Sequence, residues 1–426
     1  MSEEQLVELR KYERDTEQCM KCGFCNFVCP VYQEEKIESG VARGKNELIK
    51  RVLSGELELT RDLADRLYKC TACMACTELC PAKAAIPRLV VAARADIASS
   101  IGVRFPYGLI YRRILSNRKL FGTILSAASV FQSLLMQKTS GMVQHMPDFL
   151  AGLTKGRLIP SIAKKYLRQL APEVSKPKTG KAPIMRVGYF TGCMNEFVTP
   201  QIGLKTIDFL ARQGIEVVMP RTQGCCGAAV FLGGGDFATG RALADSNVKA
   251  FEGLDYIIAD CATCACALTE YPHFLADNQQ RTEAYARFAG KVKHSTQFLV
   301  DVLNLPSSAY RLSPELQGKK LTWHDPCHLN RHLGAKQQPR QIIQSLEGAN
   351  YIEMPNADRC CGMGGQFSLL NPELSMKIGD KKIESAASTE ADIVVTASPG
   401  CQFQLADGMA RLNKPQKVMN IMELLG

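Results

Sequence analysis

The chain has 426 residues, 46% of them hydrophobic, so it is long enough to bury cores in two or three domains. Its formal net charge is +10, but residues 101–181 hold fourteen Lys and Arg against two acids, which indicates one basic segment rather than a basic protein. The start is charged and has no apolar signal segment, which argues against a secreted disulfide framework. We therefore expect a cytoplasmic protein in which most of the eighteen cysteines bind metal.

Residues 1–100 contain eight cysteines in two copies of the pattern C-x2-C-x2-C-x3-C-P, with a helical stretch near 45–69 between them. The first copy is Cys19, Cys22, Cys25 and Cys29, and the second is Cys70, Cys73, Cys76 and Cys80. This is the bacterial-ferredoxin run, in which three cysteines bind one cubane and the fourth binds the other.

We therefore expect two [4Fe–4S] cubanes in a ferredoxin-type domain. One is assigned to Cys19, Cys22, Cys25 and Cys80, and the other to Cys70, Cys73, Cys76 and Cys29. Zinc is the alternative, but zinc sites do not require eight cysteines in this triple spacing with a trailing proline. Two cubanes in one small domain predict a path for single electrons.

Residues 101–182 lack cysteine, are basic and end in the linker APEVSKPKTGKAP, so we expect a helical connecting segment. Its stretch 120–136 is uncharged and slightly short for a membrane span. Apolar residues fall on one helical stripe: Leu120, Phe121, Ile124, Leu125, Ala128, Phe131, Leu134 and Leu135. We favour docking of this helix on a partner protein, with peripheral contact of 104–136 at the cytoplasmic face of a membrane as the alternative. No nucleic-acid-binding module accompanies the charge.

Residues 183–426 are an internal duplication, which we divide into units 183–310 and 311–426. Cys193 matches Cys327 at an offset of 134, and Cys264 matches Cys401 at 137. Each half has strand-like runs, such as MRVGYFTG, DYIIAD, KLTWHD and DIVVTA, separated by helical patterns. This alternation predicts a small parallel α/β unit twice over, with cysteines at the carboxyl ends of strands. The fold class we expect is therefore α/β and α+β in several domains.

Adjacent cysteines followed by glycine occur once in each half, in QGCCGAA and DRCCGMG. The first half has Cys193, the pair Cys225 and Cys226, and then Cys261 and Cys264. This pattern resembles the cysteine-rich CCG domain of heterodisulfide reductase and of the iron–sulfur subunits of glycolate oxidase and lactate-utilisation complexes. The resemblance implies a noncubane [4Fe–4S] cluster held by those five cysteines. A buried vicinal pair without metal is the alternative.

The second half has four matching cysteines, Cys327, Cys360, Cys361 and Cys401, with Ser398 at the position of Cys261. A serine hydroxyl is a poor iron ligand beside a thiolate. A four-cysteine cubane, a noncubane cluster with an altered ligand and no cluster all remain open, and we favour a [4Fe–4S] cluster.

Three histidines, His324, His328 and His332, flank Cys327. They could hydrogen-bond to cluster sulfurs or handle protons, but we favour a role in covering a turn and do not count them as ligands. Cys266 has no counterpart in the repeat and is expected to be a packed free thiol.

The order of two ferredoxin motifs and two CCG units resembles the iron–sulfur subunit of glycolate oxidase and lactate dehydrogenase complexes over nearly the whole chain. The resemblance implies an electron-transfer subunit that accepts electrons from an FAD-containing partner oxidising a 2-hydroxy acid. It would pass them to a quinone, an electron-transfer flavoprotein or another carrier. The chain has no dinucleotide fingerprint and no Walker loop, so we expect the FAD on the partner and no catalytic residue here.

Two other functions stay open. A catalytic subunit of the heterodisulfide-reductase type would cleave a disulfide at the CCG-bound cluster. Against it, the half that departs from the pattern is the second, which that family ties to catalysis. A zinc-rich scaffold without redox activity is the third hypothesis.

Overall fold

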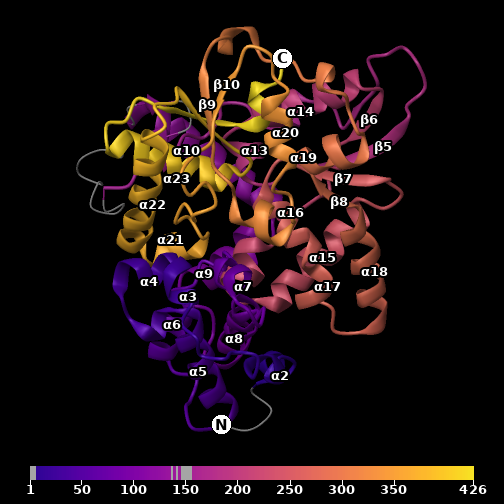
Figure 1. Ribbon diagram of the computed structural model, residues 1–426. Helices are drawn as coiled ribbons and strands as arrows, with labels where there is room; N and C mark the ends of the chain where they lie inside the picture. The colour runs from indigo at the N-terminus through magenta and orange to yellow at the C-terminus, as the bar shows by residue number, and fades with distance from the viewer. Residues whose placement is uncertain (1–5, 136–137, 141–142, 145–155) are drawn as a thin grey trace.

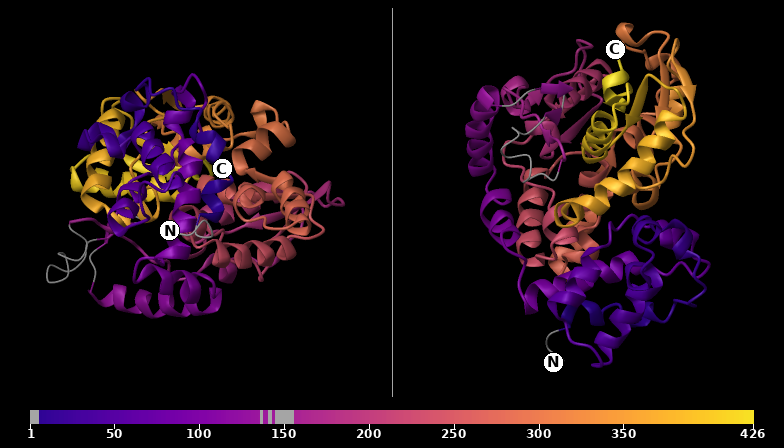
Figure 2. Two further views of the ribbon diagram at one scale, coloured as in Figure 1. Left: turned by 90° about the horizontal axis from the view of Figure 1, so that it is seen from below. Right: turned by 90° about the vertical axis from the view of Figure 1, so that its left-hand side faces the viewer.

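The computed structural model describes residues 6–135, 138–140, 143–144 and 156–426. The chain forms a helical N-terminal unit and two α/β units that stand side by side above it in Figure 1. A long helix of the connecting segment lies along the outside of the α/β units, as the right-hand view of Figure 2 shows.

The N-terminal unit is built from short helices around one long, buried helix. They are α1 (Val7–Arg10), α2 (Glu13–Thr16), α3 (Cys25–Val28), α4 (Pro30–Glu35), α5 (Ala42–Leu53), α6 (Arg61–Tyr68), α7 (Ala75–Leu79) and α8 (Ile86–Ser100). Helix α8 is buried along twelve of its fifteen residues, so it forms the centre of this unit and contacts α1, α5 and α6.

The helical stretch expected near 45–69 consists of two helices, α5 and α6. Gly55 adopts a positive φ of 79° just after α5, which ends the helix. The side chain of Thr60 then accepts a hydrogen bond from the Leu63 amide and begins α6. The break turns the chain back, so that both helices pack on α8.

The connecting segment contains α9 (Tyr107–Leu109), η3 (Ile110–Leu115), α10 (Arg118–Leu135) and α12 (Leu167–Leu170), with short strands β1 (Lys138–Ser140), β2 (Val143–Gln144) and β3 (Ile159–Pro160). Helix α10 packs Phe121 against Phe197 of the first α/β unit, with ring centroids 5.1 Å apart. The side chains of Phe131, Leu134 and Leu135 lie outside the described residues. Among the described residues, no helix combines the length and the hydropathy that a membrane span requires.

The first α/β unit has a five-stranded sheet in the order β4-β6-β5-β7-β8. Its strands are β4 (Val174–Ser175), β5 (Met185–Phe190), β6 (Ile215–Val218), β7 (Tyr256–Ala259) and β8 (Val292–His294). Only the edge strand β4 is antiparallel to its neighbour. The main helices of this unit are α13 (Met194–Phe197), α14 (Pro200–Arg212), α15 (Phe237–Ala250), α16 (Ala262–Thr269), α17 (Tyr271–Phe274) and α18 (Gln279–Lys291).

The second α/β unit has a fully parallel sheet of four strands in the order β10-β9-β11-β12. Its strands are β9 (Lys320–Trp323), β10 (Asn350–Ile352), β11 (Ile393–Thr396) and β12 (Lys417–Asn420). Its helical elements include η9 (His328–His332), α20 (Gln338–Gln344), α21 (Gln366–Leu370), α22 (Pro372–Ala387) and α23 (Pro399–Arg411). The expected α/β units thus form, with strands where the four apolar runs lie.

The two α/β units share one hydrophobic core rather than meeting at a polar interface. Tyr189 and Ile258 of the first sheet and Trp323 and Val395 of the second belong to the same buried cluster. Backbone bonds also cross between the units, since the Ala262 amide donates to the Ala397 carbonyl at 3.1 Å. The carboxyl ends of β7 and β11 therefore face each other.

Candidate metal centres

Two small adjacent cavities in the N-terminal unit are lined by the ferredoxin-type cysteines. One of about 30 Å³ is lined by Cys19, Cys22, Cys25 and Cys80, and another of about 30 Å³ by Cys29, Cys70, Cys73 and Cys76. Cys76 borders both cavities. The structure thus brings the last cysteine of each run beside the first three of the other run.

Proline explains why the fourth cysteine of each run leaves its own group. Cys29 and Cys80 are extended, with ψ of 114° and 124°, and each precedes a proline. A residue before proline is disfavoured in the helical region, so α3 and α7 end there and the side chain turns toward the neighbouring cavity.

The first two cysteines of each run lie on loops with the same unusual backbone, and the third lies in the first turn of the helix that follows. Lys21 and Ala72 occupy equivalent positions and both have positive φ, 58° and 53°. Gly23 and Met74 repeat the feature one residue after the second cysteine, at 85° and 60°. Left-handed residues in such loops turn successive amides toward a shared concave side, which suits an anionic group.

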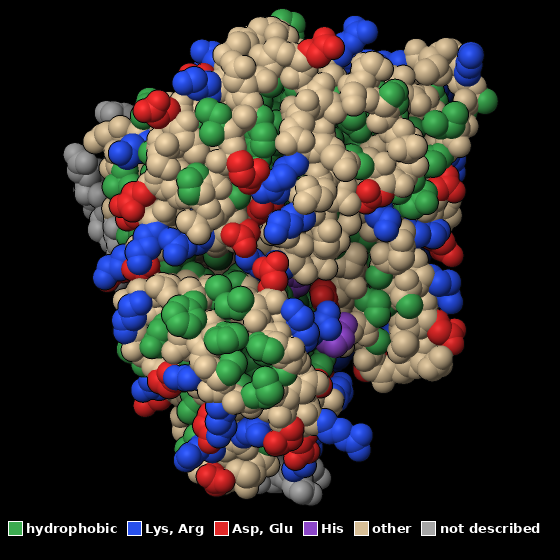
Figure 3. Space-filling view, viewed as in Figure 1, with side chains coloured by type: hydrophobic (Ala, Val, Ile, Leu, Met, Phe, Trp, Pro, Cys, Tyr) green, Lys and Arg blue, Asp and Glu red, His purple; other side chains and the backbone are tan. Residues whose placement is uncertain are grey.

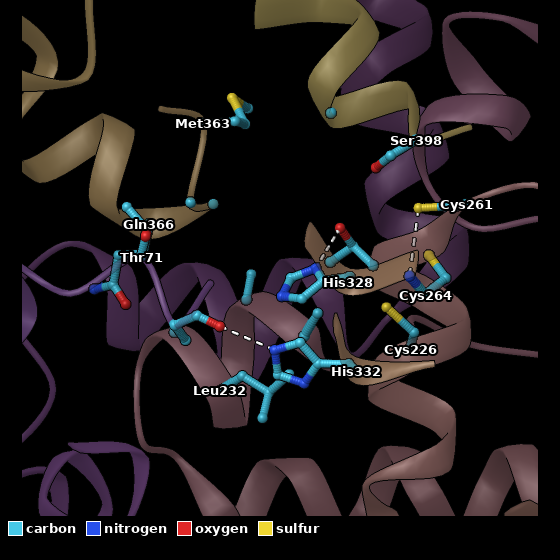
Figure 4. A pocket seen from close by; sticks show the side chains of 18 of the residues that line it. Thr71, Cys226, Leu232, Cys261, Cys264, His328, His332, Met363, Gln366 and Ser398 are labelled. Atoms are coloured by element: carbon cyan, nitrogen blue, oxygen red, sulfur yellow. Dashed lines mark hydrogen bonds between the residues drawn. The ribbon is translucent and has the colours of Figure 1, made fainter. Parts of the chain in front are cut away.

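A larger cavity of about 350 Å³ lies where the two α/β units meet the N-terminal unit. It is lined by nine cysteines: Cys193, Cys225, Cys226, Cys261, Cys264, Cys327, Cys360, Cys361 and Cys401. Figure 4 shows Cys226, Cys261 and Cys264 on one side of this space, with Ser398 above them and Met363 and Gln366 across it. Every predicted CCG cysteine therefore reaches one cavity.

The five cysteines of the first unit lie together beyond the carboxyl ends of β5, β6 and β7. Three of them are buried (Cys225, Cys226 and Cys264), and Cys193 and Cys261 are partly exposed. Cys261 is the N-cap of α16, and its sulfur accepts a hydrogen bond from the Cys264 amide at 3.4 Å. Hydrogen bonds from Cys225 and Cys264 lower the pKa of Cys226 to about 6. Gly227 has φ of 80°, and a Cβ there would meet the Phe231 ring at 3.1 Å, so glycine allows the turn behind the pair.

The second unit repeats this arrangement with one substitution. Ser398 is the N-cap of α23, as Cys261 is of α16, which supports matching the two positions. The Cys361 and Cys401 sulfurs are 3.3 Å apart, and a hydrogen bond from Cys327 lowers the pKa of Cys360. A Cβ on Gly362 would meet the Ser375 carbonyl at 2.5 Å.

His324 adds a nitrogen donor to this second group. It is fully buried, and one of its ring nitrogens lies within 4.8 Å of the Cys361 and Cys401 sulfurs. Among the described residues, neither of its ring nitrogens has a hydrogen-bond partner. Burial lowers the pKa of His324 well below its usual range, so the imidazole is neutral and has a lone pair.

Buried cations stand beside these thiols. Arg118 of α10 donates to the Cys193 sulfur at 3.7 Å and to the Gly192 carbonyl at 2.8 Å. Arg94 donates to the Cys70 carbonyl at 2.6 Å, and Lys382 lies near Cys361 while its amine donates to the Ala357 carbonyl at 2.8 Å. Buried charges of one sign need partners of the other sign, so these cations fit anionic clusters.

Comparison with known proteins agrees with the duplicated architecture. Residues 187–269 and 321–406 match the cysteine-rich domain family, and residues 15–84 match the 4Fe-4S dicluster domain. The chain belongs to the cysteine-rich domain family. It therefore binds iron–sulfur clusters, for which the cysteine-lined cavities and buried cations are suited.

Two of the relatives described here match nearly the whole chain, and a third matches just over half of it. A probable glycolate oxidase iron-sulfur subunit of Bacillus subtilis is 31% identical over 94% of this chain and 90% of its own length. A lactate utilization protein A of Oceanobacillus iheyensis is 33% identical over 57% of this chain and 96% of its own. A component of the fumarate reductase (CoM/CoB) of Methanothermobacter marburgensis is 28% identical, covering 96% of this chain and 71% of its own.

A solved structure has a similar fold at low identity. The crystal structure of a hypothetical protein from Helicobacter pylori superposes with a TM-score of 0.53 at 9% identity. It covers 99% of this chain and 72% of the other. The likeness concerns the fold alone.

The sequence does not signal the buried cations or one contact between units. It marks Arg118 only as part of a basic segment, and nothing in it singles out Lys382. Cys73 of the N-terminal unit is buried against Cys360 of the second α/β unit, a contact between residues 287 positions apart that no local pattern indicates.

Proposed function

We propose that this chain is the iron–sulfur electron-transfer subunit of a glycolate- or lactate-oxidising dehydrogenase complex. The observation that carries the proposal is the gathering of all seventeen predicted cysteine ligands into three neighbouring cavities. The clusters supply one-electron transfer, and the residues of this chain hold them, exclude water and balance their charge.

We assign two cubane [4Fe–4S] clusters to the N-terminal unit. Cys19, Cys22, Cys25 and Cys80 hold one, and Cys29, Cys70, Cys73 and Cys76 hold the other, as the two cavities suggest. A nearby cation such as Arg94 raises the reduction potential of such a site, whereas low exposure to water lowers it, because reduction adds negative charge.

We assign a noncubane [4Fe–4S] cluster to Cys193, Cys225, Cys226, Cys261 and Cys264. A further [4Fe–4S] cluster is assigned to Cys327, Cys360, Cys361 and Cys401. At this second centre, His324 is the remaining donor beside the thiolates, since Ser398 stands where the fifth cysteine would be. Histidine ligates iron in some iron–sulfur centres, so its place beside Cys361 and Cys401 is chemically suitable.

The contacts between cavities define an order for the electrons. Cys76 borders both cavities of the N-terminal unit. Cys73 of the inner cavity is packed against Cys360 of the second α/β centre, and that centre shares its cavity with the first. Clusters held by these residues would exchange electrons between the N-terminal unit and the α/β units at the contact of Cys73 with Cys360.

A partner flavoprotein supplies substrate chemistry in this proposal. The names of the relatives imply a complex, and we assign the FAD and the 2-hydroxy-acid site to that partner. The N-terminal unit offers an access point, because Cys22 is exposed beside Met20 and Phe24, which are 64% and 47% exposed. Figure 3 shows apolar side chains gathered on this lower unit. We place the complex in the cytoplasm, with a quinone, an electron-transfer flavoprotein or another carrier as acceptor. Segment 104–136 would dock on a partner protein, with peripheral contact at the cytoplasmic face of a membrane as the alternative.

Disulfide cleavage is the second candidate, favoured by one observation. One relative, 28% identical over 96% of this chain, carries CoM/CoB in its name. A chain of this kind would reduce a heterodisulfide at the second centre without a flavin partner.

Co-purification and cluster analysis of the full chain test the proposal. Anaerobically isolated protein should be brown, contain about sixteen irons and sixteen sulfides for four clusters, and give EPR signals after dithionite. A flavoprotein should co-purify, and lactate or glycolate should reduce the clusters only in its presence. Reduction of a thiol heterodisulfide by the isolated chain would favour the second candidate, and an iron-poor protein would contradict both.

A further inference from the structure

A second group of metal-ligating side chains lies outside the proposed cluster ligands. It comprises Cys266 of α16 and His328 and His332 of η9, and one ligand atom from each lies within 4.8 Å of the others. The carboxylate of Glu270 is 3.9 Å from Nδ1 of His332, at the edge of this three-residue group, and is the candidate fourth donor. Figure 4 shows the two imidazoles next to each other at the floor of the central cavity.

The hydrogen bonds around the two histidines leave one ring nitrogen of each available to bind a metal. Nε2 of His332 lies 3.0 Å from the Ala72 carbonyl, which can only accept, so Nε2 holds the proton and Nδ1 is free to bind. Nδ1 of His328 lies 2.9 Å from the Thr263 hydroxyl, which leaves Nε2 as the ligand atom. Metal-bound histidines are held in this way, with the second ring nitrogen fixed by a hydrogen bond.

The duplicated fold does not itself require these donors. The positions in the other half that match Cys266, His328 and His332 by the offsets of 137 and 134 are Phe403, Met194 and Val198. Apolar side chains therefore serve the same places in the repeat. The fold therefore does not explain why polar groups gather here. A buried thiol lies close to two imidazoles, with a carboxylate beside them, and such groups need a partner.

The donor types select the metal. A single thiolate is too few for an iron–sulfur cluster, whereas one Cys, two His and one carboxylate suit tetrahedral zinc. The group is nearly closed, since the His332 and Glu270 side chains are only 12% and 11% exposed. A closed set of four protein ligands is typical of a structural site rather than a catalytic one.

We propose that Cys266, His328, His332 and Glu270 bind one structural zinc ion that joins the two CCG units at the central cavity. Cys266 and Glu270 come from the first α/β unit, and both histidines come from the second. Two of these side chains also contact the N-terminal unit: His332 donates to the Ala72 carbonyl, and Glu270 lies 3.3 Å from the Arg88 guanidinium. The ion would therefore fix the relative positions of all three units.

Metal analysis of the full chain, purified anaerobically with its clusters, tests the site. We expect about one zinc per chain, with an X-ray absorption shell of one sulfur at about 2.3 Å and nitrogen or oxygen neighbours at about 2.0 Å. Zinc surrounded only by sulfur would belong to a cluster site and would overturn the proposal. So would a preparation with negligible zinc.

Variants locate the ion independently of folding and of the clusters. Cys266→Ser and His332→Gln should lower zinc binding roughly ten-fold or more while iron content stays at the wild-type value. His273→Gln is the matched control, because His273 bonds to Tyr12 at 2.9 Å and takes no part in the group. Unchanged zinc in Cys266→Ser, with iron retained, would contradict the assignment. Loss of iron clusters from the wild type would instead contradict the proposed function and leave the zinc measurement unaffected.

Discussion

At the scale of single residues, the charge beside each thiol group decides how readily a cluster there accepts an electron. Arg118 is 13% exposed and reaches Cys193 from α10, so its charge is poorly screened by water. Its partner Glu196 lies 3.7 Å away and is deeply buried, which fixes the guanidinium in place. The basic segment thus contributes a specific cation to the first α/β centre as well as a surface charge.

Replacing this cation should lower the reduction potential of that centre. We expect Arg118→Gln to shift it downward by roughly 60 mV, the equivalent of about 1.4 kcal/mol for one electron, because the reduced cluster loses a stabilising positive charge. EPR-monitored redox titration measures the shift. Lys119→Gln removes the same charge from an exposed neighbour on α10 and should move the potential far less. Equal shifts in both variants would show that Arg118 acts only through net charge.

At the scale of elements, local pattern predicts most of the strands and cannot predict their partners. The runs at β5, β7, β9 and β11 are short, apolar and β-branched, and such runs form buried parallel strands in either half. The stretch expected to be helical near 45–69 contains α5 and α6, and its division into two helices depends on Gly55 and on the capping by Thr60, which apolar periodicity does not reveal. The packing of α1 on α8 also could not be predicted from the sequence, because it depends on hydrogen bonds to Asp96, which lies 87 and 88 positions from its partners Leu9 and Glu8.

Asp96 predicts a pH dependence in the N-terminal unit. Its buried carboxylate accepts hydrogen bonds from the Glu8 and Leu9 amides at 2.9 and 2.8 Å. Burial raises the pKa of Asp96 to about 6, whereas an unfolded aspartate titrates near 3.9. Between these values the folded state binds the extra proton, so the free energy of unfolding falls as the pH rises, by roughly 3 kcal/mol in total.

Asp96→Asn should therefore flatten this dependence. Unfolding by denaturant is measured between pH 5 and 7.5, a range in which the clusters stay bound. As the pH rises, the free energy of unfolding should fall less in the variant than in the wild type. Asp62→Asn on the exposed side of α6 is the control and should keep the wild-type slope. A slope unchanged by Asp96→Asn would mean that another group titrates in this window.

At the scale of the whole molecule, the two α/β units share one hydrophobic core and are not independent domains joined by a linker. The constant offsets in the sequence predict the two repeats and their matching cysteines, because each of these is a short local pattern. They contain no information on how the repeats pack, so the shared core around Trp323 and the contact of Cys73 with Cys360 emerge only in three dimensions. The same packing turns two cysteine groups toward one cavity.

The fused core predicts that the first α/β unit does not survive without the second. A chain ending at residue 310 would expose the face of Tyr189 and Ile258 that packs with Trp323, and it would lose the Ala397 acceptor of the Ala262 amide. Exposed contiguous apolar surface of this kind leads to aggregation. We expect residues 1–310 alone to be insoluble, and 1–310 co-expressed with 311–426 as a second chain to be soluble and iron-loaded. Soluble fraction and iron content measure both. A soluble, cluster-bearing 1–310 fragment would show that the units are independent, and the cavity between them would then be an ordinary domain interface.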